Sequence, residues 1–488
     1  MRVRLFLALV AGASLSSPAF TYEPEGASGT RGELTRYTIG MAREGVAHIQ
    51  IDHTLANGVV YIRHSTAADG TTTDDFISNA TISGTHGTAP MEPLGNGGWS
   101  TSAAAIGDRV LIEYDLRLGH GDHAWAHGRE EIGFKLGDGA FLVSRTTLLA
   151  DYGDQNSPIE VAFDAEDSAA PWTPIGHNLW RADDLDSFLN NCFTFGSGFG
   201  RFIAETEQGN VTFIHDEAST DLAKQAARDI APALQHTTAI FGSFPASNFH
   251  IFLFENDHPE GGAYDDSFAM LHPVPAQQVD ALLWRQGFIH EINHLWVGHA
   301  IRPANQADIE WFKEGVADYL AIKTMWKLGY LEDHTLEGKL ANLMRRHTLG
   351  VFMSRGQVGL TEAGANKSEN MMIIYGSGAT WSFMLDVEMA AHQGPGAFER
   401  MLRDLYEHSE KPYTQARLME RINVTSNGAA GRLLAQFERN LMPMAFPAML
   451  EPYGMELAFM IPDMFELDLN PRRLTGVDRL PAFLRDAE

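Results

Sequence analysis

Hydrophobic and polar residues alternate along the first part of the chain. Runs such as Val46–Ile51, Arg109–Tyr114 and Ile159–Phe163 have apolar side chains at about every second position, and clusters of Gly, Asn, Asp and Pro separate them. A period of two is typical of strands that bury one face. The pattern therefore predicts an antiparallel β-domain over residues 20–195.

After this region the apolar spacing changes to three and four residues, which is typical of helices. Two strands, 211–215 and 249–254, remain among helices predicted over 219–241, 277–297, 309–328 and 379–392. Shorter amphipathic helices are predicted at 396–406, 414–422 and 432–441. We expect a multidomain α+β protein with a mixed domain over 196–393 and a small, mostly helical part over 394–488.

The predicted helix 277–297 contains the sequence His-Glu-Ile-Asn-His at His290–His294. On a helix, the two histidines lie one turn apart and point the same way. Two imidazoles so placed can hold one zinc ion, and Glu291 beside them is then a general base. The alternative is a chance match, in which both histidines have ordinary hydrogen-bond partners and the glutamate lies on the surface.

A zinc site of this kind needs a third protein ligand and one open position. Nineteen residues separate His294 from Glu314, which lies on the next predicted helix. Asp308 is the expected N-cap of that helix and Gly329 its expected stop. We predict Glu314 as the third ligand. Asp318, four residues on, shares its face and is either a partner that orients a ligand histidine or one more solvated charge.

These motifs also resemble a known family. His290–Val297, Ile301–Pro303 and Trp311–Gly315 combine the HExxH, an Arg-Pro loop and a Trp-Phe-x-Glu-Gly helix. An HExxH followed by a Glu-Gly helix resembles the gluzincin metallopeptidases. The whole pattern is similar to the glycyl aminopeptidase family and, more distantly, to aminopeptidase N. The resemblance implies a zinc enzyme with one Zn2+ ion, in which a β-domain precedes a thermolysin-like catalytic domain.

The resemblance extends to a tyrosine. Ile373–Trp381 matches a Tyr-x-x-Gly context of the family, although Ser377 replaces the Lys that usually precedes the second Gly. It implies that Tyr375 donates a hydrogen bond to the oxyanion. One such donor typically contributes about 2.7–4 kcal/mol in the transition state. The alternative is a buried tyrosine with a satisfied hydroxyl.

The family places a Gly-rich edge strand before the HExxH helix, where the substrate backbone pairs with it. The corresponding positions here are Gly261, Gly262, Ala263, Asp265 and Asp266. The usual Glu that binds the substrate amine is replaced by Tyr264, so either following aspartate is a candidate for that role. The alternative is a loop whose aspartates only terminate the strand.

From this resemblance we expect an aminopeptidase that removes small N-terminal residues, Gly or Ala, from peptides. An endopeptidase or another zinc hydrolase on the same fold is the alternative enzyme. A non-catalytic binding protein is the remaining class. The net charge of −27 repels nucleic acid and anionic membranes, so no nucleic-acid partner is predicted.

The first residues are typical of an export signal. Met1–Arg4 is basic, Leu5–Leu15 is apolar but too short to span a membrane, and small residues end at Ala19. We predict cleavage after Ala19, no transmembrane anchor in the mature chain, and a periplasmic or extracellular location. Cys192 is the single cysteine, which excludes an intramolecular disulfide.

A second group of histidines lies in the predicted β-domain. His120, His123 and His127 fall within eight residues that also include Asp122. They form either a second metal site or a polar surface loop, since the neighbouring Gly121 indicates a loop in which spacing is unconstrained.

Overall fold

The computed structural model describes residues 33–125, 132–165, 167–205, 209–245, 248–256, 260–272, 281–305, 307–439, 446–459 and 471–475. These residues form two compact units. The N-terminal unit contains the described residues up to 205, 209–227 and 248–272, and the C-terminal unit contains 228–245 and those from 281 onward. The predicted signal peptide, residues 1–19, lies outside the described residues.

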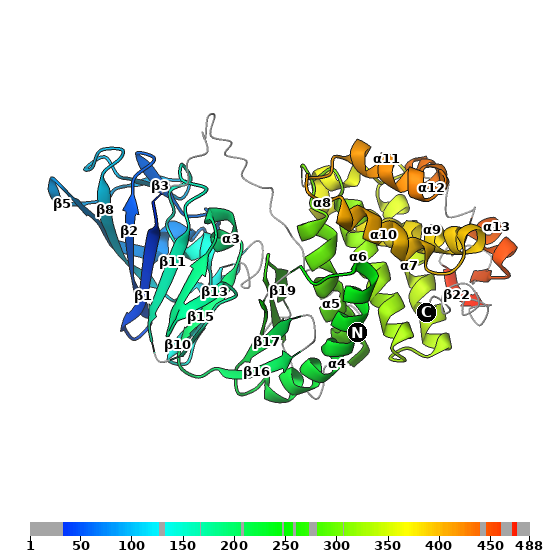
Figure 1. The fold of residues 1–488 in the computed structure, drawn as a ribbon, viewed down its shortest axis with the longest axis horizontal. Helices are drawn as coiled ribbons and strands as arrows, with labels where there is room; N and C mark the ends of the chain where they lie inside the picture. The colour runs from blue at the N-terminus through cyan, green and yellow to red at the C-terminus, as the bar shows by residue number, and fades with distance from the viewer. Residues whose placement is uncertain are drawn as a thin grey trace. The chain divides into compact units, whose positions relative to one another are not determined.

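The N-terminal unit is built on a sheet of eight strands (Figure 1). Their order is β13 (Thr173–Gly176), β14 (Leu179–Ala182), β11 (Ile159–Asp164), β1 (Thr35–Arg43), β2 (Val46–Thr54), β8 (Arg109–Arg117), β4 (Ile77–Gly84) and β5 (Gly87–Pro90). Alternate residues of β2 are buried, as the pattern predicts. The predicted antiparallel domain is confirmed, with the exception that β1 and β11 pair in parallel.

Smaller sheets complete the β-domain. One has the order β12 (Asp167–Ala169), β15 (Cys192–Gly196), β10 (Gly139–Val143) and β9 (Gly133–Leu136), and another β3 (Val59–Tyr61), β7 (Gly98–Ser100) and β6 (Pro93–Gly95). The short helices are α2 (Ser144–Thr147) and α3 (Leu185–Leu189).

A five-stranded sheet also belongs to the N-terminal unit. Its order is β16 (Gly200–Glu205), β17 (Asn210–His215), β18 (Asn248–Glu255), β20 (Ser267–His272) and β19 (Glu260–Ala263). The predicted boundary at residue 195 falls within β15, and the five-stranded sheet that follows it still groups with the β-domain by its contacts. The domain boundaries given above stay predictions.

Helices dominate the C-terminal unit. They are α5 (Ala281–His294), α6 (Glu310–Lys327), α7 (Asp333–Met353), α8 (Lys367–Met371), α9 (Gly378–Gln393), α10 (Ala397–Glu407), α11 (Gln415–Thr425), α12 (Ala429–Glu438) and α13 (Phe446–Leu450). The long helix α4 (Thr220–Phe241) begins in the N-terminal unit and ends in this one. Strands β21 (Glu456–Phe459) and β22 (Pro471–Thr475) pair antiparallel.

Helix α6 is the central element of this unit, because nearly every residue from Glu310 to Trp326 is buried. The helix ends before Gly329, which has a φ of 73° and is the predicted stop. The predicted N-cap was wrong. Ile309 takes that position without a side-chain capping bond, and its burial rather than a cap at Asp308 anchors the start. Within the described residues, no helix is long and apolar enough to cross a membrane.

Candidate metal centre and active site

The structure brings three predicted side chains together at the contact between α5 and α6. His290 and His294 lie one turn apart on α5, and their Nε2 atoms are 3.1 Å apart. Oε2 of Glu314, on α6, is 3.3 Å from each of these nitrogen atoms. All three residues are buried, with at most 3% of their surface exposed.

The spacing of these three atoms fits a zinc ion. Tetrahedral bonds of about 2.0–2.1 Å place neighbouring ligand atoms about 3.3 Å apart. Oε2 of Glu314 is buried and has no hydrogen-bond partner in the described part of the chain, as expected for an atom that faces an ion. Among the described residues, these three form the one group of His, Cys, Asp or Glu arranged to hold a metal.

The backbone after His294 prepares that ring as a ligand. A π-helical turn, Leu295–Ala300, follows α5, and within it Gly298 has a φ of 129°. The turn places the carbonyl of Val297 3.0 Å from Nδ1 of His294. Nδ1 therefore donates this bond and Nε2 keeps its lone pair for a metal. Burial lowers the pKa of His294 to about 4, so the ring stays neutral.

Asp318 faces the other histidine without bonding to it. Its Oδ1 lies 3.8 Å from Nδ1 of His290, beyond hydrogen-bond distance. The carboxylate accepts bonds from Arg346 at 2.6 Å and from Gln286 at 3.1 Å. Burial opposes ionisation of Asp318, but Arg346 and His290 outweigh burial and lower its pKa. Asp318 thus places a negative charge behind the ring, and its direct role as an acceptor stays a prediction.

Glu291 is a buried carboxyl beside this group. Only 3% of its surface is exposed, and its Oε2 has no hydrogen-bond partner among the described residues. Burial raises the pKa of Glu291 to about 7. A carboxyl with such a pKa can both accept and return a proton near neutral pH.

Tyr375 lies against the same group. It belongs to a π-helical turn, Met372–Ser377, that leads directly into α9. Its ring is stacked on that of His290, with the centroids 6.0 Å apart. Burial and the negative charge of Glu314 raise the pKa of Tyr375 well above its usual value. The hydroxyl therefore stays protonated and remains a hydrogen-bond donor.

Two glycines explain why Tyr375 lies close to Glu314. A Cβ on Gly315 would meet the backbone carbonyl carbon of Gly378 at 2.3 Å, and a Cβ on Gly378 would meet the carbonyl oxygen of Trp311 at 2.2 Å. Helices α6 and α9 therefore touch backbone to backbone. Gly315, the glycine that follows Glu314, is thus needed for the close packing of α6 against α9.

Replacing Gly315 by Ala should destabilise the protein by about 1–3 kcal/mol, because backbone atoms of α9 must move to admit the methyl group. Gly338→Ala is a matched control, since Gly338 lies within α7 with nothing near its Cβ position. That change should stabilise by about 0.5–1 kcal/mol. Urea unfolding measures both, and equal effects would contradict the packing argument.

Solved structures share this architecture, although no protein-family model and no curated protein matches the sequence. An aminopeptidase N family protein from Idiomarina loihiensis matches with a TM-score of 0.72 at 14% identity, over 88% of this chain and 80% of its own. An M1 zinc metallopeptidase mutant from Deinococcus radiodurans, bound to Tyr-Ser-Ala, matches with a TM-score of 0.51 at 13% identity, over 84% and 94%. The chain has the fold of the M1 zinc metallopeptidases. Yeast LTA4 hydrolase bound to bestatin gives a TM-score of 0.53 at 11% identity, over 84% of this chain and 69% of its own.

The edge strand expected of an M1 fold is present as β19, which pairs antiparallel with β20 at the end of its sheet. Tyr264 is buried, and the amides of Asp265 and Asp266 bond to Asn190 and Asn191. All of these residues belong to the N-terminal unit, whereas the three proposed zinc ligands, His290, His294 and Glu314, belong to the C-terminal unit. Their role in substrate binding stays a prediction.

The second histidine group does not form a metal site among the described residues of this M1-like chain. His120 is fully buried and stacks on Phe76 with centroids 3.9 Å apart, and burial lowers its pKa to about 3. His123 bonds to Asp69 at 2.7 Å instead. His127 lies outside the described residues.

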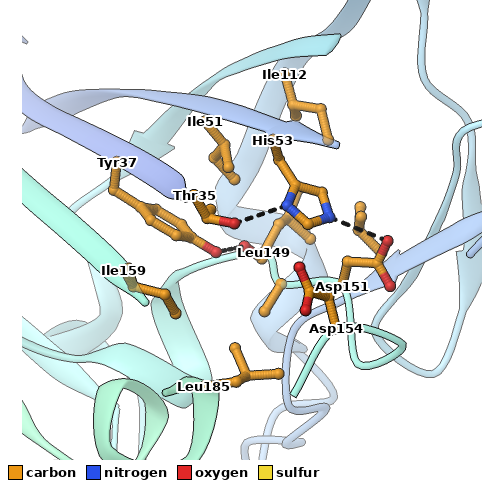
Figure 2. Close-up of a pocket in the computed structure, with 12 residues that line it drawn as sticks. Thr35, Tyr37, Ile51, His53, Ile112, Leu149, Asp151, Asp154, Ile159 and Leu185 are labelled. Carbon is orange, nitrogen blue, oxygen red and sulfur yellow. Dashed lines mark hydrogen bonds and ion pairs between the residues drawn. The ribbon is translucent and has the colours of Figure 1, made fainter. Parts of the chain in front are cut away.

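The β-domain also contains a buried chain of hydrogen bonds (Figure 2). Thr35 bonds to Nδ1 of His53, and Nε2 of His53 lies 3.2 Å from Oδ2 of Asp151. The adjoining cavity has a volume of about 10 Å³, room for about one water molecule. Asp151 also accepts bonds from the amides of Ala56 and Asn57. These bonds fix two loops together, and the cavity has no space for a substrate.

Several charged neighbours of the candidate site were not predicted from the sequence. Lys367 bonds to Glu314 and Glu310, Lys313 lies near both, and Arg346 holds Asp318. Lys313 and Glu310 flank the predicted ligand on α6, so a helical projection would have found them. Lys367 and Arg346 come from other segments and give no local signal.

Proposed function

We propose that the protein is a zinc-dependent metallopeptidase whose ion is held by His290, His294 and Glu314. The observation that carries this proposal is the set of three buried ligand atoms, 3.1–3.3 Å apart, with Glu291 and Tyr375 beside them. The shared M1 fold supports the same reaction class. A non-catalytic binding protein has no need of a base and a donor beside such a group.

The surrounding residues supply the proton transfers. Bound zinc would supply Lewis acidity and a water molecule of lowered pKa. Glu291 accepts the proton of the attacking water and returns it to the leaving amine. The hydroxyl of Tyr375 donates to the oxyanion that develops on the substrate carbonyl. Burial of both residues excludes competing water and strengthens these interactions.

For the substrate, we propose an aminopeptidase that acts on peptides with N-terminal Gly or Ala, with β19 and either Asp265 or Asp266 binding the peptide and its amine. The test is hydrolysis of Gly- and Ala-anilides by the purified protein, with and without a chelator. Cleavage that the chelator abolishes and zinc restores would support the proposal. Lack of cleavage of both anilides and of blocked peptides, by protein with stoichiometric zinc, would contradict it.

An endopeptidase is the second candidate, favoured by one observation. The position of the usual amine-binding Glu holds Tyr264, whose ring lies under the guanidinium of Arg145 at 5.6 Å. Chelator-sensitive cleavage of an N-terminally blocked peptide, without cleavage of the anilides, would identify this activity. For location we propose export, supported by the pattern of residues 1–19, and sequencing should find the mature chain starting at Phe20.

Tyr375→Phe should lower kcat by about 10²–10³-fold, the typical effect of losing one oxyanion donor. The ring that stacks on His290 is kept, so zinc content and KM should change little. Steady-state kinetics on the anilide or the blocked peptide measures this change. An unchanged kcat would assign Tyr375 to packing alone.

A further inference from the structure

The two oxygens of Glu314 face different neighbours. Oε2 lies 3.3 Å from Nε2 of both His290 and His294. Oε1 accepts a hydrogen bond from Nζ of Lys367 at 2.8 Å. Glu314 is fully buried and Lys367 is 8% exposed, so water does not compete for this bond. The carboxylate is thereby held in one rotational position.

Lys367 itself is fixed by a second carboxylate. Its ammonium group also bonds to Oε1 of Glu310, one turn before Glu314 on α6. Lys367 begins α8, a different segment, so one cation from outside bridges two acids on the same face of the central helix. Without this cation, two buried carboxylates at i,i+4 would repel each other.

Lys313 provides a natural comparison. It also lies near Oε1 of Glu314, but at 3.3 Å, and it is 3.6 Å from Glu310. It belongs to α6 itself, and its methylene carbons lie close to Gly298, where an added Cβ would meet them at 3.1 Å. Lys313 therefore adds positive charge with a longer contact, whereas Lys367 makes the shorter, directed bond.

We propose that Lys367 is a positioning residue of the metal centre, which holds Oε1 of Glu314 so that Oε2 alone is offered to the ion. A glutamate that binds through one oxygen leaves the fourth position of a tetrahedral site open for water and substrate. Release of Oε1 would free the carboxylate to rotate, so Oε2 would no longer be held 3.3 Å from the two histidine nitrogen atoms. The inference rests on the proposed zinc site and extends it to a residue outside the ligand set.

The test is the zinc dissociation constant of the full-length protein, measured by competition with a chromophoric chelator. Lys367→Met should weaken zinc binding about 10–100-fold, the usual effect of losing a partner of a metal ligand. Lys367→Arg should recover part of this loss, and Lys313→Met should cost less than Lys367→Met. Circular dichroism of each variant, measured after a chelator has removed the zinc, establishes that the variant is folded. Unchanged zinc affinity in Lys367→Met would overturn the proposal.

A purely structural role for Lys367 would be to neutralise Glu310. In the double variant Lys367→Met with Glu310→Gln, the negative charge of Glu310 is removed together with the positive charge of Lys367. No carboxylate at position 310 is then left without a cation. Zinc affinity that stays reduced in the double variant supports positioning of Glu314, and a return to the wild-type value overturns it. This test measures zinc binding and not hydrolysis. A wild-type protein that binds zinc but cleaves no peptide would contradict the proposed peptidase function, and the effect of Lys367 on zinc affinity could still be measured.

Discussion

Glu291→Gln should lower kcat for peptide hydrolysis by about 10²–10⁴-fold, the usual contribution of a general base. Glutamine keeps the size of the side chain but cannot accept and return a proton. Because Glu291 does not belong to the three proposed ligands, the variant should still bind one zinc ion per chain. Steady-state kinetics and the zinc content of the purified variant measure the two effects together.

A matched control for this change is Glu362→Gln, since Glu362 is an exposed residue of the same unit. It removes the same charge without altering the site and should retain wild-type kcat. If Glu291→Gln lost its zinc as well, the loss of activity would not report on proton transfer. Full activity of a zinc-loaded Glu291→Gln protein would remove Glu291 from the mechanism.

Glu314→Gln should weaken zinc binding by more than about 100-fold, beyond the 10–100-fold expected for an outer partner of a ligand. The neutral amide is a poor ligand for zinc. It also removes one of the two carboxylates that balance the positive charges of Lys313 and Lys367. Hydrolysis should be lost at zinc concentrations that saturate the wild type. Chelator competition and isothermal titration measure the affinity.

Glu310→Gln is the control for that result. Glu310 lies one turn earlier on α6, is equally buried, and bonds to the same Lys367. Its change alters the charge of the cluster by the same amount but removes no proposed ligand, so stoichiometric zinc should remain. Equal loss of zinc from both variants would contradict the assignment of Glu314.

The helices of the candidate site could be predicted from local patterns. The period of the apolar residues predicted α5 and α6, and the glycine at 329 marked the end of α6 because only a residue tolerant of positive φ suits that position. The HExxH motif and Glu314 were predictable because chemistry requires those residue types at that spacing. Their convergence to 3.1–3.3 Å then follows from the packing of two helices.

Other features depend on contacts between distant parts of the chain. Lys367 meets Glu314 across 53 residues, and Arg346 meets Asp318 across 28. The π-helical turn under Tyr375 interrupts the 3.6-residue period, so a pattern search marks it only as a helix start. The parallel pairing of β1 with β11 joins residues 35 and 159, and alternation alone does not specify a strand's partner.

Because α6 is buried on nearly every side, its amide hydrogens can exchange with solvent only when the C-terminal unit opens as a whole. Glu314 lies in the middle of this slowly exchanging segment rather than at a frayed helix end. Deuterium uptake over residues 310–327 should therefore be among the slowest in the chain. A metal ligand in such a segment keeps its place when the ion leaves, so the protein should take zinc up again after chelation without refolding.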